Sequence, residues 1–390
     1  MKGTSIILTL VFLALHAPQS SRAQSPDSSL EKKADSLFLG VTSPDAPGLV
    51  VLVRQNGKTV FERGYGVRDL RTKTRIDART NFRLASFTKQ FTAMAIMLLV
   101  HDGKLHYEDR LTKFFPGFPA YGNGITIRNL LNHTSGLPDY EGLMEAEEKV
   151  KGPVWTPEHQ IQDEEVLRLL EKASSGLFAQ GTSWAYSNSG YVLLGLIAAK
   201  ASGKPFGDFL TERIFAPLHM DHTLLYIKGK NEVTNRAYGH TKEKETGEFK
   251  ETDQSPTSAT QGDGGVYTSL DDLAKWDDAL RKHTLLSAEE MKPALSEAKL
   301  ADGSPTHWPD TPHGDNGTPA KPVSYGFGWF LDPYQGHPRM WHAGSTEGFR
   351  TVIERFTEDK VTVIILCNRT DLNETKLAED LADLYLKRPL

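Results

Sequence analysis

Strand-like segments lie at both ends of this chain, and helical patterns fill its middle. Near the start, residues 49–53 and 59–65 are rich in β-branched and aromatic side chains. They flank Asn56-Gly57, which is the strongest two-residue hairpin signal because both turn positions need a positive φ. Near the end, four more segments have a strand-like pattern: residues 325–330, 340–342, 349–356 and 361–366. The two ends of the chain are therefore predicted to build one antiparallel sheet together.

The helical patterns predict what surrounds this sheet. A helix is expected from Ser86 to about Asp102, and residues 93–100 within it are apolar almost all round. A helix without a polar face lies in the centre of a domain. We predict an α+β fold, with an antiparallel sheet flanked by helices. In it, residues 24–390 form one unit that includes a mainly helical lobe at about residues 104–300.

The first residues have the pattern of a secretory signal. Lys2 supplies a positive charge, residues 6–15 form a short apolar run, and small side chains stand at Ser21 and Ala23. We expect residues 1–23 to be removed and the protein to be secreted or periplasmic, without stable membrane insertion. The apolar run is shorter than the about 20 residues that cross a bilayer, although an uncleaved anchor is the alternative interpretation.

The composition excludes several classes of partner. The formal net charge is -5 and no run of Lys and Arg is dense enough for a phosphate track, so nothing favours nucleic acid. The single cysteine, Cys367, ends an apolar segment, and a buried, inert thiol is expected there. We expect no cofactor, and the sequence leaves the oligomeric state open.

No metal is expected either. Four side chains with metal-ligand chemistry cluster in one stretch of the chain: His307, Asp310, His313 and Asp315. That stretch is a polar loop rich in Pro, Gly and Asp, and spacing within such a loop is poor evidence for a metal site.

Ser86 and Lys89 are the first candidates for chemistry. A serine hydroxyl is a weak nucleophile and needs a neighbouring base to take its proton. Residues three apart on a helix are neighbours, and a lysine whose pKa is lowered by burial can accept that proton. The same spacing occurs elsewhere, at Ser29/Lys32 and Ser296/Lys299. It therefore also arises by chance, and a plain helix cap is the alternative for Ser86.

Tyr186 and Asn188 form a second element, just before an apolar helix expected at residues 191–201. A tyrosine held near cations ionises more easily and serves as a general base, and an asparagine holds a lysine or a substrate amide. Tyr121 and Asn123 have the same spacing, but they lie beside glycines and are expected to form only a turn.

His342, Gly344 and Ser345 form a third element on a predicted C-terminal strand. A strand beside a nucleophile can lend a backbone N–H to an oxyanion hole, and small residues let a substrate approach the backbone closely. A histidine on a strand is usually just a satisfied surface or core residue, so that interpretation stays open for His342.

In this order, the three elements resemble the serine β-lactamase-like family, which includes class C β-lactamases, D,D-carboxypeptidases, D-aminopeptidases and related esterases. The resemblance runs from about residue 47 to residue 368. It includes two long linking segments, ITIRNLLNHTSGLP at residues 125–138 and GGVYTS at residues 264–269. It implies a β-lactamase/transpeptidase-like fold and a serine hydrolase that works through an acyl-enzyme.

The resemblance also implies a role for each site residue. The implied catalytic residues are Ser86, Lys89 and Tyr186, and the implied substrate-binding residues are Asn188, His342, Gly344 and Ser345. Ser86 would be acylated, while Lys89 and Tyr186 would share the general-base work. Asn188 would orient Lys89 and the substrate amide. The backbone N–H groups of Ser86 and Ser345 would form the oxyanion hole.

His342 departs from the pattern of lactam-hydrolysing relatives, which usually carry the lysine of Lys-Thr-Gly there and bind a substrate carboxylate with it. Histidine is mostly neutral at pH 7 and more of it is charged near pH 6. Arg350 is another possible source of charge, although a solvated strand residue is the plainer interpretation. A small carboxylic ester or a D-amino-acid peptide is therefore the favoured substrate. The alternatives are a true β-lactamase and a non-catalytic descendant that binds peptidoglycan fragments or a partner protein.

Overall fold

A computed structural model describes residues 28–307 and 322–386 of the chain. The expected signal segment, residues 1–23, lies outside the described residues. So do three members of the polar-loop cluster, Asp310, His313 and Asp315.

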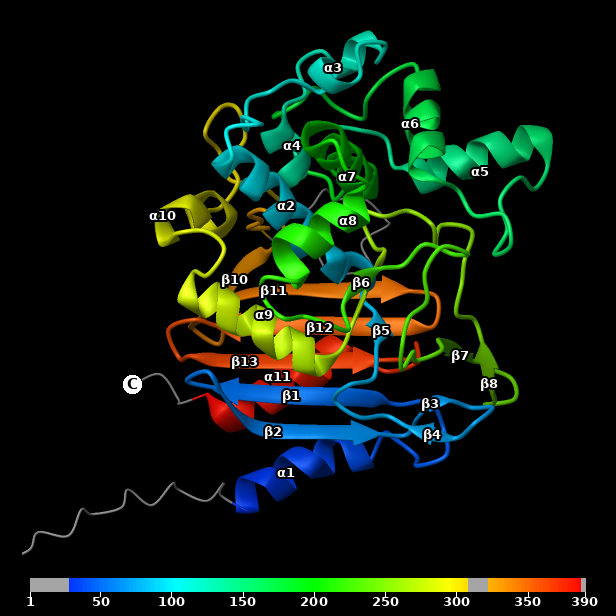
Figure 1. Cartoon of the computed structure of the whole chain (residues 1–390), viewed down its shortest axis with the longest axis vertical. Coiled ribbons are helices and arrows are strands. Elements are labelled where there is room, and N and C mark those ends of the chain that lie inside the picture. The colour runs from blue at the N-terminus through cyan, green and yellow to red at the C-terminus, as the bar shows by residue number, and fades with distance from the viewer. Residues whose placement is uncertain (1–27, 308–321, 387–390) are drawn as a thin grey trace, which may run out of the picture.

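The two ends of the chain build one six-stranded antiparallel sheet, as predicted (Figure 1). Its strand order is β10-β11-β12-β13-β1-β2. The strands are β1 (Leu49–Gln55), β2 (Lys58–Tyr65), β10 (Phe330–Tyr334), β11 (His337–Thr346), β12 (Phe349–Phe356) and β13 (Val361–Cys367). Strands β1 and β2 form the predicted hairpin, with positive φ at Asn56 (53°) and Gly57 (76°). Strand β1 also pairs with β13, from Leu49 opposite Cys367 to Gln55 opposite Val361.

One strand prediction is wrong in its position. The segment at residues 325–330 was expected to be extended, but β10 begins only at Phe330. The Gly326 N–H donates to the Trp329 carbonyl at 2.8 Å, and Gly328 has a φ of +78°. These two glycines allow a tight turn before β10, and that turn takes Tyr325 to the edge of the site described below.

Both faces of the sheet are covered, which explains why its central strands are continuously apolar. Alternate residues of β1 point to opposite sides. Val50 and Leu52 join the large core under the helical lobe, while Val51 and Val53 join a smaller core. The smaller core is closed by α1 (Ser28–Leu39) and by α11 (Glu374–Tyr385), which packs on β13 and β12 (Figure 1).

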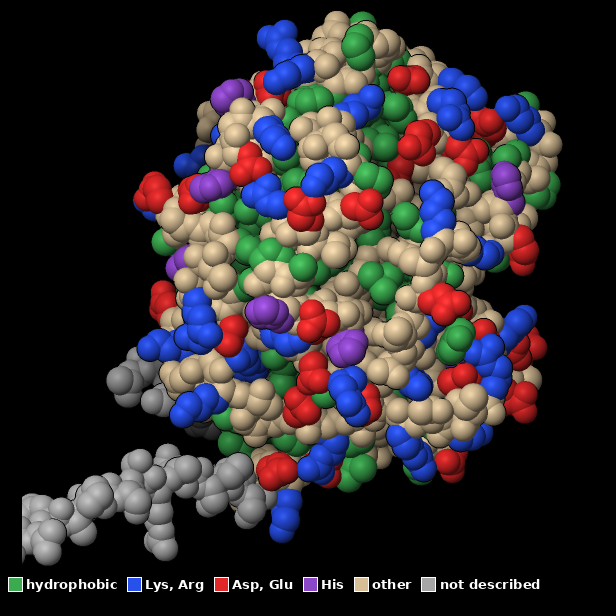
Figure 2. Space-filling view, in the orientation of Figure 1, with side chains coloured by type: hydrophobic (Ala, Val, Ile, Leu, Met, Phe, Trp, Pro, Cys, Tyr) green, Lys and Arg blue, Asp and Glu red, His purple; other side chains and the backbone are tan. Residues whose placement is uncertain are grey.

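The other face carries α9 (Leu270–Lys282) and most of the remaining helices. These are α2 (Lys89–His101), α3 (Leu111–Phe114), α4 (Ile127–Leu131), α5 (Tyr140–Lys151), α6 (Asp163–Lys172), α7 (Asn188–Ser202), α8 (Phe206–Leu210) and α10 (Ala288–Met291). Three smaller sheets are also present: β9 (Val266–Thr268) pairs with both β5 (Phe82–Arg83) and β6 (Leu224–Leu225), β3 (Val67–Asp69) pairs with β4 (Thr74–Arg75), and β7 (His240–Lys242) pairs with β8 (Phe249–Glu251). On the face that Figure 2 shows, basic and acidic side chains are intermixed. No helix in the described ranges is long and apolar enough to cross a membrane.

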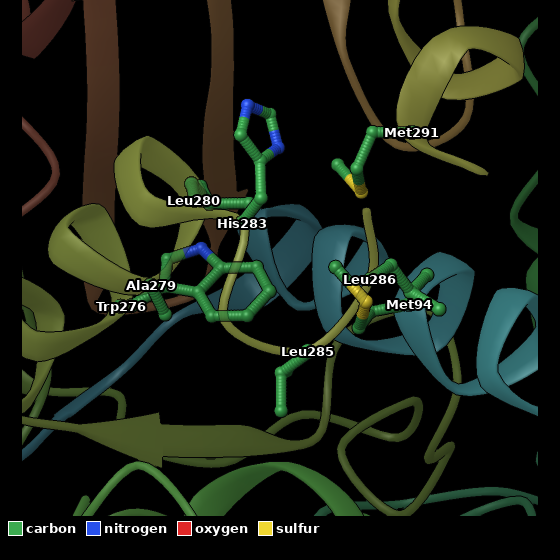
Figure 3. Close-up of a pocket in the computed structure, with 8 residues that line it drawn as sticks. All are labelled: Met94, Trp276, Ala279, Leu280, His283, Leu285, Leu286 and Met291. Atoms are coloured by element: carbon green, nitrogen blue, oxygen red, sulfur yellow. The ribbon is translucent and has the colours of Figure 1, made fainter. Parts of the chain in front are cut away.

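The central helix is α2, as its apolar composition predicted. All but its last two residues are buried, and it packs against α7. Its Phe91 ring lies 4.7 Å from that of Trp276 on α9. The cavity drawn in Figure 3, between α2, α9 and α10, measures only about 10 Å³, which is barely enough for one water molecule. Close packing therefore fixes α2, and with it the residues at its N-terminal end.

Asp277 of α9 ties the helical side to the sheet. Its carboxylate accepts hydrogen bonds from Arg54 of β1 (2.7 Å), Arg355 of β12 (2.8 Å) and Thr362 of β13 (2.9 Å). Asp277 is only 2% exposed, and both arginines are also buried. One buried carboxylate thus contacts two buried guanidinium groups, and it is the only carboxylate paired with Arg355 within the described residues.

We predict that Asp277→Ala lowers the free energy of unfolding by about 3–5 kcal/mol, because it leaves the buried Arg355 without a carboxylate and Arg54 with only the part-exposed Asp278. Urea unfolding followed by circular dichroism measures this difference. The matched control is Asp278→Ala on the same helix. Asp278 is part-exposed and also pairs with Arg54, so its loss is expected to cost under about 1 kcal/mol. Equal losses in the two variants would contradict the role given to Asp277.

Candidate active site

Ser86 lies in a 3₁₀ turn, Ala85–Thr88, that leads directly into α2. The preceding residue, Ala85, has a φ of +50°, which is uncommon for a residue with a side chain. Strand β11 lies against this turn: a Cβ on Gly344 would stand 2.0 Å from the Leu84 carbonyl oxygen. The Thr351 hydroxyl of β12 donates to that same carbonyl at 2.8 Å. Only glycine at 344 allows this approach, which brings β11 beside Ser86.

Lys89 is completely buried, one turn from Ser86. Its Nζ lies 3.1 Å from Ser86 Oγ, 2.8 Å from Asn188 Oδ1 and 3.0 Å from the Asp263 carbonyl. Burial lowers the pKa of Lys89 to about 8, while the nearby negative charges of Asp263, Asp139 and Glu141 oppose this effect. At neutral pH a useful fraction of this amine is therefore unprotonated and able to take a proton from Ser86.

Tyr186 lies beside the same pair, but it does not fit the expectation of an easily ionised phenol. Its ring centroid is 4.9 Å from Lys89 Nζ. Burial nevertheless raises the pKa of the Tyr186 phenol well above its ordinary value, and the Ser86 hydroxyl opposes this only partly. Its buried oxygen makes no hydrogen bond of ordinary geometry within the described residues. The resting tyrosine is thus a neutral proton donor, because burial outweighs the nearby cation.

Asn188 is the first residue of α7, and Ser187 caps this helix, because its Oγ accepts the Gly190 N–H at 3.0 Å. This capped start aims the Asn188 amide at Lys89. Tyr121, which shares the Tyr-x-Asn spacing, lies in a short 3₁₀ turn, and its hydroxyl donates to the Leu170 carbonyl at 2.6 Å. The turn expected at Tyr121 is therefore present.

His342 is buried on β11 and differs from the sequence expectation in its charge. Its Nδ1 lies 2.6 Å from the Ala343 carbonyl, which can only accept, so Nδ1 carries the proton. Its Nε2 then accepts from the Tyr325 hydroxyl at 3.1 Å. Burial and the charge of Lys89 lower the pKa of His342 to about 3. The prediction that pH 6 charges this imidazole is therefore wrong.

Arg350 is not a free cation either. Its guanidinium donates to the carbonyls of Thr346 and Phe349, at 2.7 and 2.8 Å. It therefore supports the turn between β11 and β12.

Gly344 and Ser345 lie on the part of β11 that β10 does not cover, because the β10–β11 pairing ends at Phe330 opposite Trp341. Ser345 is exposed, and it pairs with Arg350 of β12 on the opposite side of the strand. The structure thus brings Ser86, Lys89, Tyr186 and Asn188 together and places β11 alongside them.

Three residues of this site had no assigned role in the sequence analysis: His133, Asp263 and Tyr325. Asp263 supplies the carbonyl that binds Lys89, and its side chain accepts from the Tyr140 hydroxyl at 3.2 Å. It lies in the glycine-rich loop before β9, directly before the segment at residues 264–269 that carries part of the family resemblance. For Tyr325, the strand expected at residues 325–330 gave no indication that this residue would lie at the site.

The described residues contain no cluster of three His, Cys, Asp or Glu side chains placed to hold a metal ion. Cys367 is buried, and burial raises the pKa of its thiol well above the usual value. Since the thiolate is the reactive form, this cysteine is inert.

Comparison with known proteins agrees with this geometry. The family model described as Beta-lactamase matches residues 35–387. The chain belongs to the β-lactamase family. Its relatives include penicillin-binding protein 4* of Bacillus subtilis, 32% identical over 340 residues that cover 84% of this chain and 69% of that protein. It is therefore a hydrolase of the serine β-lactamase family.

Solved structures share the fold. An octameric penicillin-binding protein homologue from Pyrococcus abyssi has a TM-score of 0.74 and 26% identity, covering 92% of this chain and 76% of that chain. D-amino acid amidase from Ochrobactrum anthropi SV3, solved with D-phenylalanine, has a TM-score of 0.73 and 23% identity, covering 92% and 98%. These likenesses confirm the predicted β-lactamase/transpeptidase-like α+β fold.

The pKa of Lys89 sets the pH at which Ser86 becomes nucleophilic. We predict that the rate of covalent labelling of Ser86 by a fluorophosphonate rises between pH 6 and 9 with a midpoint near 8. Below that pH the amine is protonated and cannot take the serine proton; above it, most of the amine is free. Lys104→Gln, which changes an exposed lysine near the other end of α2, is expected to leave the midpoint in place. A labelling rate that is flat over this range would contradict the assignment.

Proposed function

We propose that this protein cleaves an ester or amide through a covalent acyl-enzyme on Ser86. The observation that carries the proposal is the buried Lys89 amine 3.1 Å from Ser86 Oγ, with its pKa lowered to about 8. Burying a lysine costs free energy. A protein that only bound peptidoglycan fragments would have no use for a depressed amine pKa beside a serine.

Acylation uses groups already in place. The neutral Lys89 amine takes the Ser86 proton, and Oγ attacks the substrate carbonyl carbon. The N–H groups of Ser86 and Ser345 stabilise the negative oxygen of the tetrahedral intermediate. As the carbon–leaving group bond breaks, the neutral Tyr186 phenol gives its proton to the departing alkoxide or amine. The Lys89 ammonium then reprotonates the phenolate.

Deacylation repeats these steps with water. The Lys89 amine takes a proton from a water molecule, whose oxygen attacks the acyl carbon. Collapse of the second intermediate releases the carboxylic acid and returns the proton to Ser86. Tyr186 thus acts mainly as an acid for the leaving group and Lys89 as the base, which divides the work that the resemblance gave to both.

The substrate class follows from the charges around the nucleophile. His342 is neutral, Arg350 supports a turn, and Asp263, Asp139 and Glu141 all exert negative fields on Lys89. A β-lactam carboxylate would therefore find no cation at residue 342, and the Arg350 Nη1 is already engaged by two backbone carbonyls. A small carboxylic ester or a D-amino-acid peptide needs no cation, so we propose these as substrates in preference to β-lactams.

The compartment and the boundaries belong to the same proposal. Residues 1–23 would be a cleaved signal peptide and the hydrolase would be secreted or periplasmic. Residues 24–390 would form its one domain, with the mainly helical lobe at about residues 104–300.

We predict that Ser86→Ala abolishes hydrolysis of p-nitrophenyl esters and labelling by a fluorophosphonate, while the thermal midpoint stays within a few degrees of the wild type. Ser86 is half-buried in its 3₁₀ turn and its hydroxyl packs no core, so loss of one oxygen should not disturb the fold. Substantial turnover in a well-folded variant would refute the acyl-enzyme on Ser86.

We also predict that esters or D-peptides are hydrolysed at least about 10- to 100-fold faster than nitrocefin, which corresponds to one missing charge-assisted contact. The ratio is expected to stay constant between pH 6 and 8, because His342 remains neutral throughout. His342→Lys should raise lactam hydrolysis relative to ester hydrolysis. Equal wild-type rates on nitrocefin and the best ester would favour the β-lactamase alternative.

A further inference from the structure

His133 is a buried histidine next to the site, and the proposed mechanism gives it no role. It lies between α4 and α5, has a φ of +64° and is completely shielded from solvent. Its carbonyl accepts the Ala185 N–H at 3.0 Å, and its Nδ1 accepts the Ser187 N–H at 3.1 Å. The residues on both sides of Tyr186 are thus tied to this one residue.

The protonation state of the His133 ring follows from these bonds. A backbone N–H can only donate, so Nδ1 is unprotonated and the neutral ring carries its hydrogen on Nε2. Burial holds the pKa of His133 well below its usual value, and the positive charge of Lys89 adds to this. The ring therefore presents a permanent acceptor to Ser187.

The rest of the ring lies among aromatic side chains. Its centroid is 4.4 Å from that of Tyr186, 4.5 Å from Tyr325 and 5.2 Å from Tyr191. Its Nε2 is buried and has no hydrogen-bond partner in the described chain. A phenyl ring would fill the same space without burying the unpaired Nε2–H, but it would offer the Ser187 N–H no acceptor. The Nδ1 acceptor is thus the one feature of the histidine that its surroundings use.

We propose that His133 is a positioning residue for the hydrolysis: by accepting the Ser187 N–H, it fixes the segment before α7 that holds the Tyr186 phenol and the Asn188 amide against Lys89. The proposal rests on the proposed function. It concerns only how two of the groups in that mechanism are held in place.

Loss of the acceptor has two consequences. The Tyr186 phenol moves relative to the leaving group, which lowers kcat more than KM because substrate contacts elsewhere remain. The Asn188 oxygen, 2.8 Å from Lys89 Nζ, also moves away. That oxygen stabilises the ammonium form, so its withdrawal makes Lys89 give up its proton at lower pH.

Two substitutions separate the acceptor from the ring. His133→Phe keeps an aromatic ring but has no acceptor. His133→Asn loses the ring, but its Oδ1 stands near the place of Nδ1, and asparagine tolerates a positive φ. We expect His133→Phe to lower kcat on a p-nitrophenyl ester about 30-fold or more, with KM changed less than about threefold. We expect His133→Asn to restore kcat to within about fivefold of the wild type.

The pH midpoint of fluorophosphonate labelling is a second measurement. A residue that only stabilised the fold would leave this midpoint unchanged. The midpoint is expected to fall by about one unit in His133→Phe, corresponding to a lost hydrogen bond to a charged group, and to stay near 8 in His133→Asn. His133→Gly provides a further pair with His133→Asn, since both lack the ring, both accept a positive φ and only one has the acceptor. If urea unfolding shows that His133→Phe is not folded, the comparison of His133→Gly with His133→Asn tests the proposal instead.

Wild-type kcat and an unchanged midpoint in His133→Phe would overturn the proposal. Equal losses and equal midpoints in the glycine and asparagine variants would overturn it as well. Ser86→Ala in the same assays keeps the two hypotheses apart. If wild-type ester turnover does not depend on Ser86, the proposed function fails, while the labelling midpoints still decide the role of His133.

Discussion

The site depends on a lysine amine placed where water does not reach. The pKa of Lys89 falls from an ordinary 10.5 to about 8, which corresponds to about 3 kcal/mol of lost preference for the charged form. Three fixed oxygens, on Ser86, Asn188 and the backbone of Asp263, keep that loss from being larger. They come from three separate segments of the chain. The packing of α2 against α7 and the glycine loop before β9 are therefore conditions for the chemistry.

Neutral groups then fill the space around this amine. The imidazole of His342, the imidazole of His133 and the phenol of Tyr186 are all buried, and each has its pKa moved toward the uncharged form. A second cation beside Lys89 would lower the pKa of its amine further. Burial keeps these three neighbouring groups uncharged and so prevents that additional fall. The same burial removes the positive charge that would hold an anionic substrate. The proposed base near neutral pH and the proposed preference for substrates without a carboxylate thus have one physical origin.

Sequence reasoning succeeded where a local pattern determines the structure. The Asn56-Gly57 turn, the apolar helix after Ser86 and the sheet shared by both chain ends follow from backbone preferences and apolar periodicity. It failed at His342 and Tyr186, because the charge of a side chain depends on what surrounds it in three dimensions. It gave no role to His133, since nothing in the sequence places residue 133 against residues 185–187. Gly326 and Gly328 are a different case: glycines are typical of a turn, but the aromatic residues that alternate with them at 325, 327 and 329 suggested a strand.

The sheet also determines when the chain can finish folding. Strand β1 lies between β2 and β13, and the Gly48 N–H donates to Asn368 Oδ1 at 2.7 Å across 320 residues of sequence. At about 5–20 residues per second, a ribosome needs roughly 15–60 seconds to make the distance between these partners. Throughout that time the N-terminal hairpin has a free apolar edge on the β13 side of β1. The sheet therefore cannot be completed until β13, some 300 residues after β1, has been made.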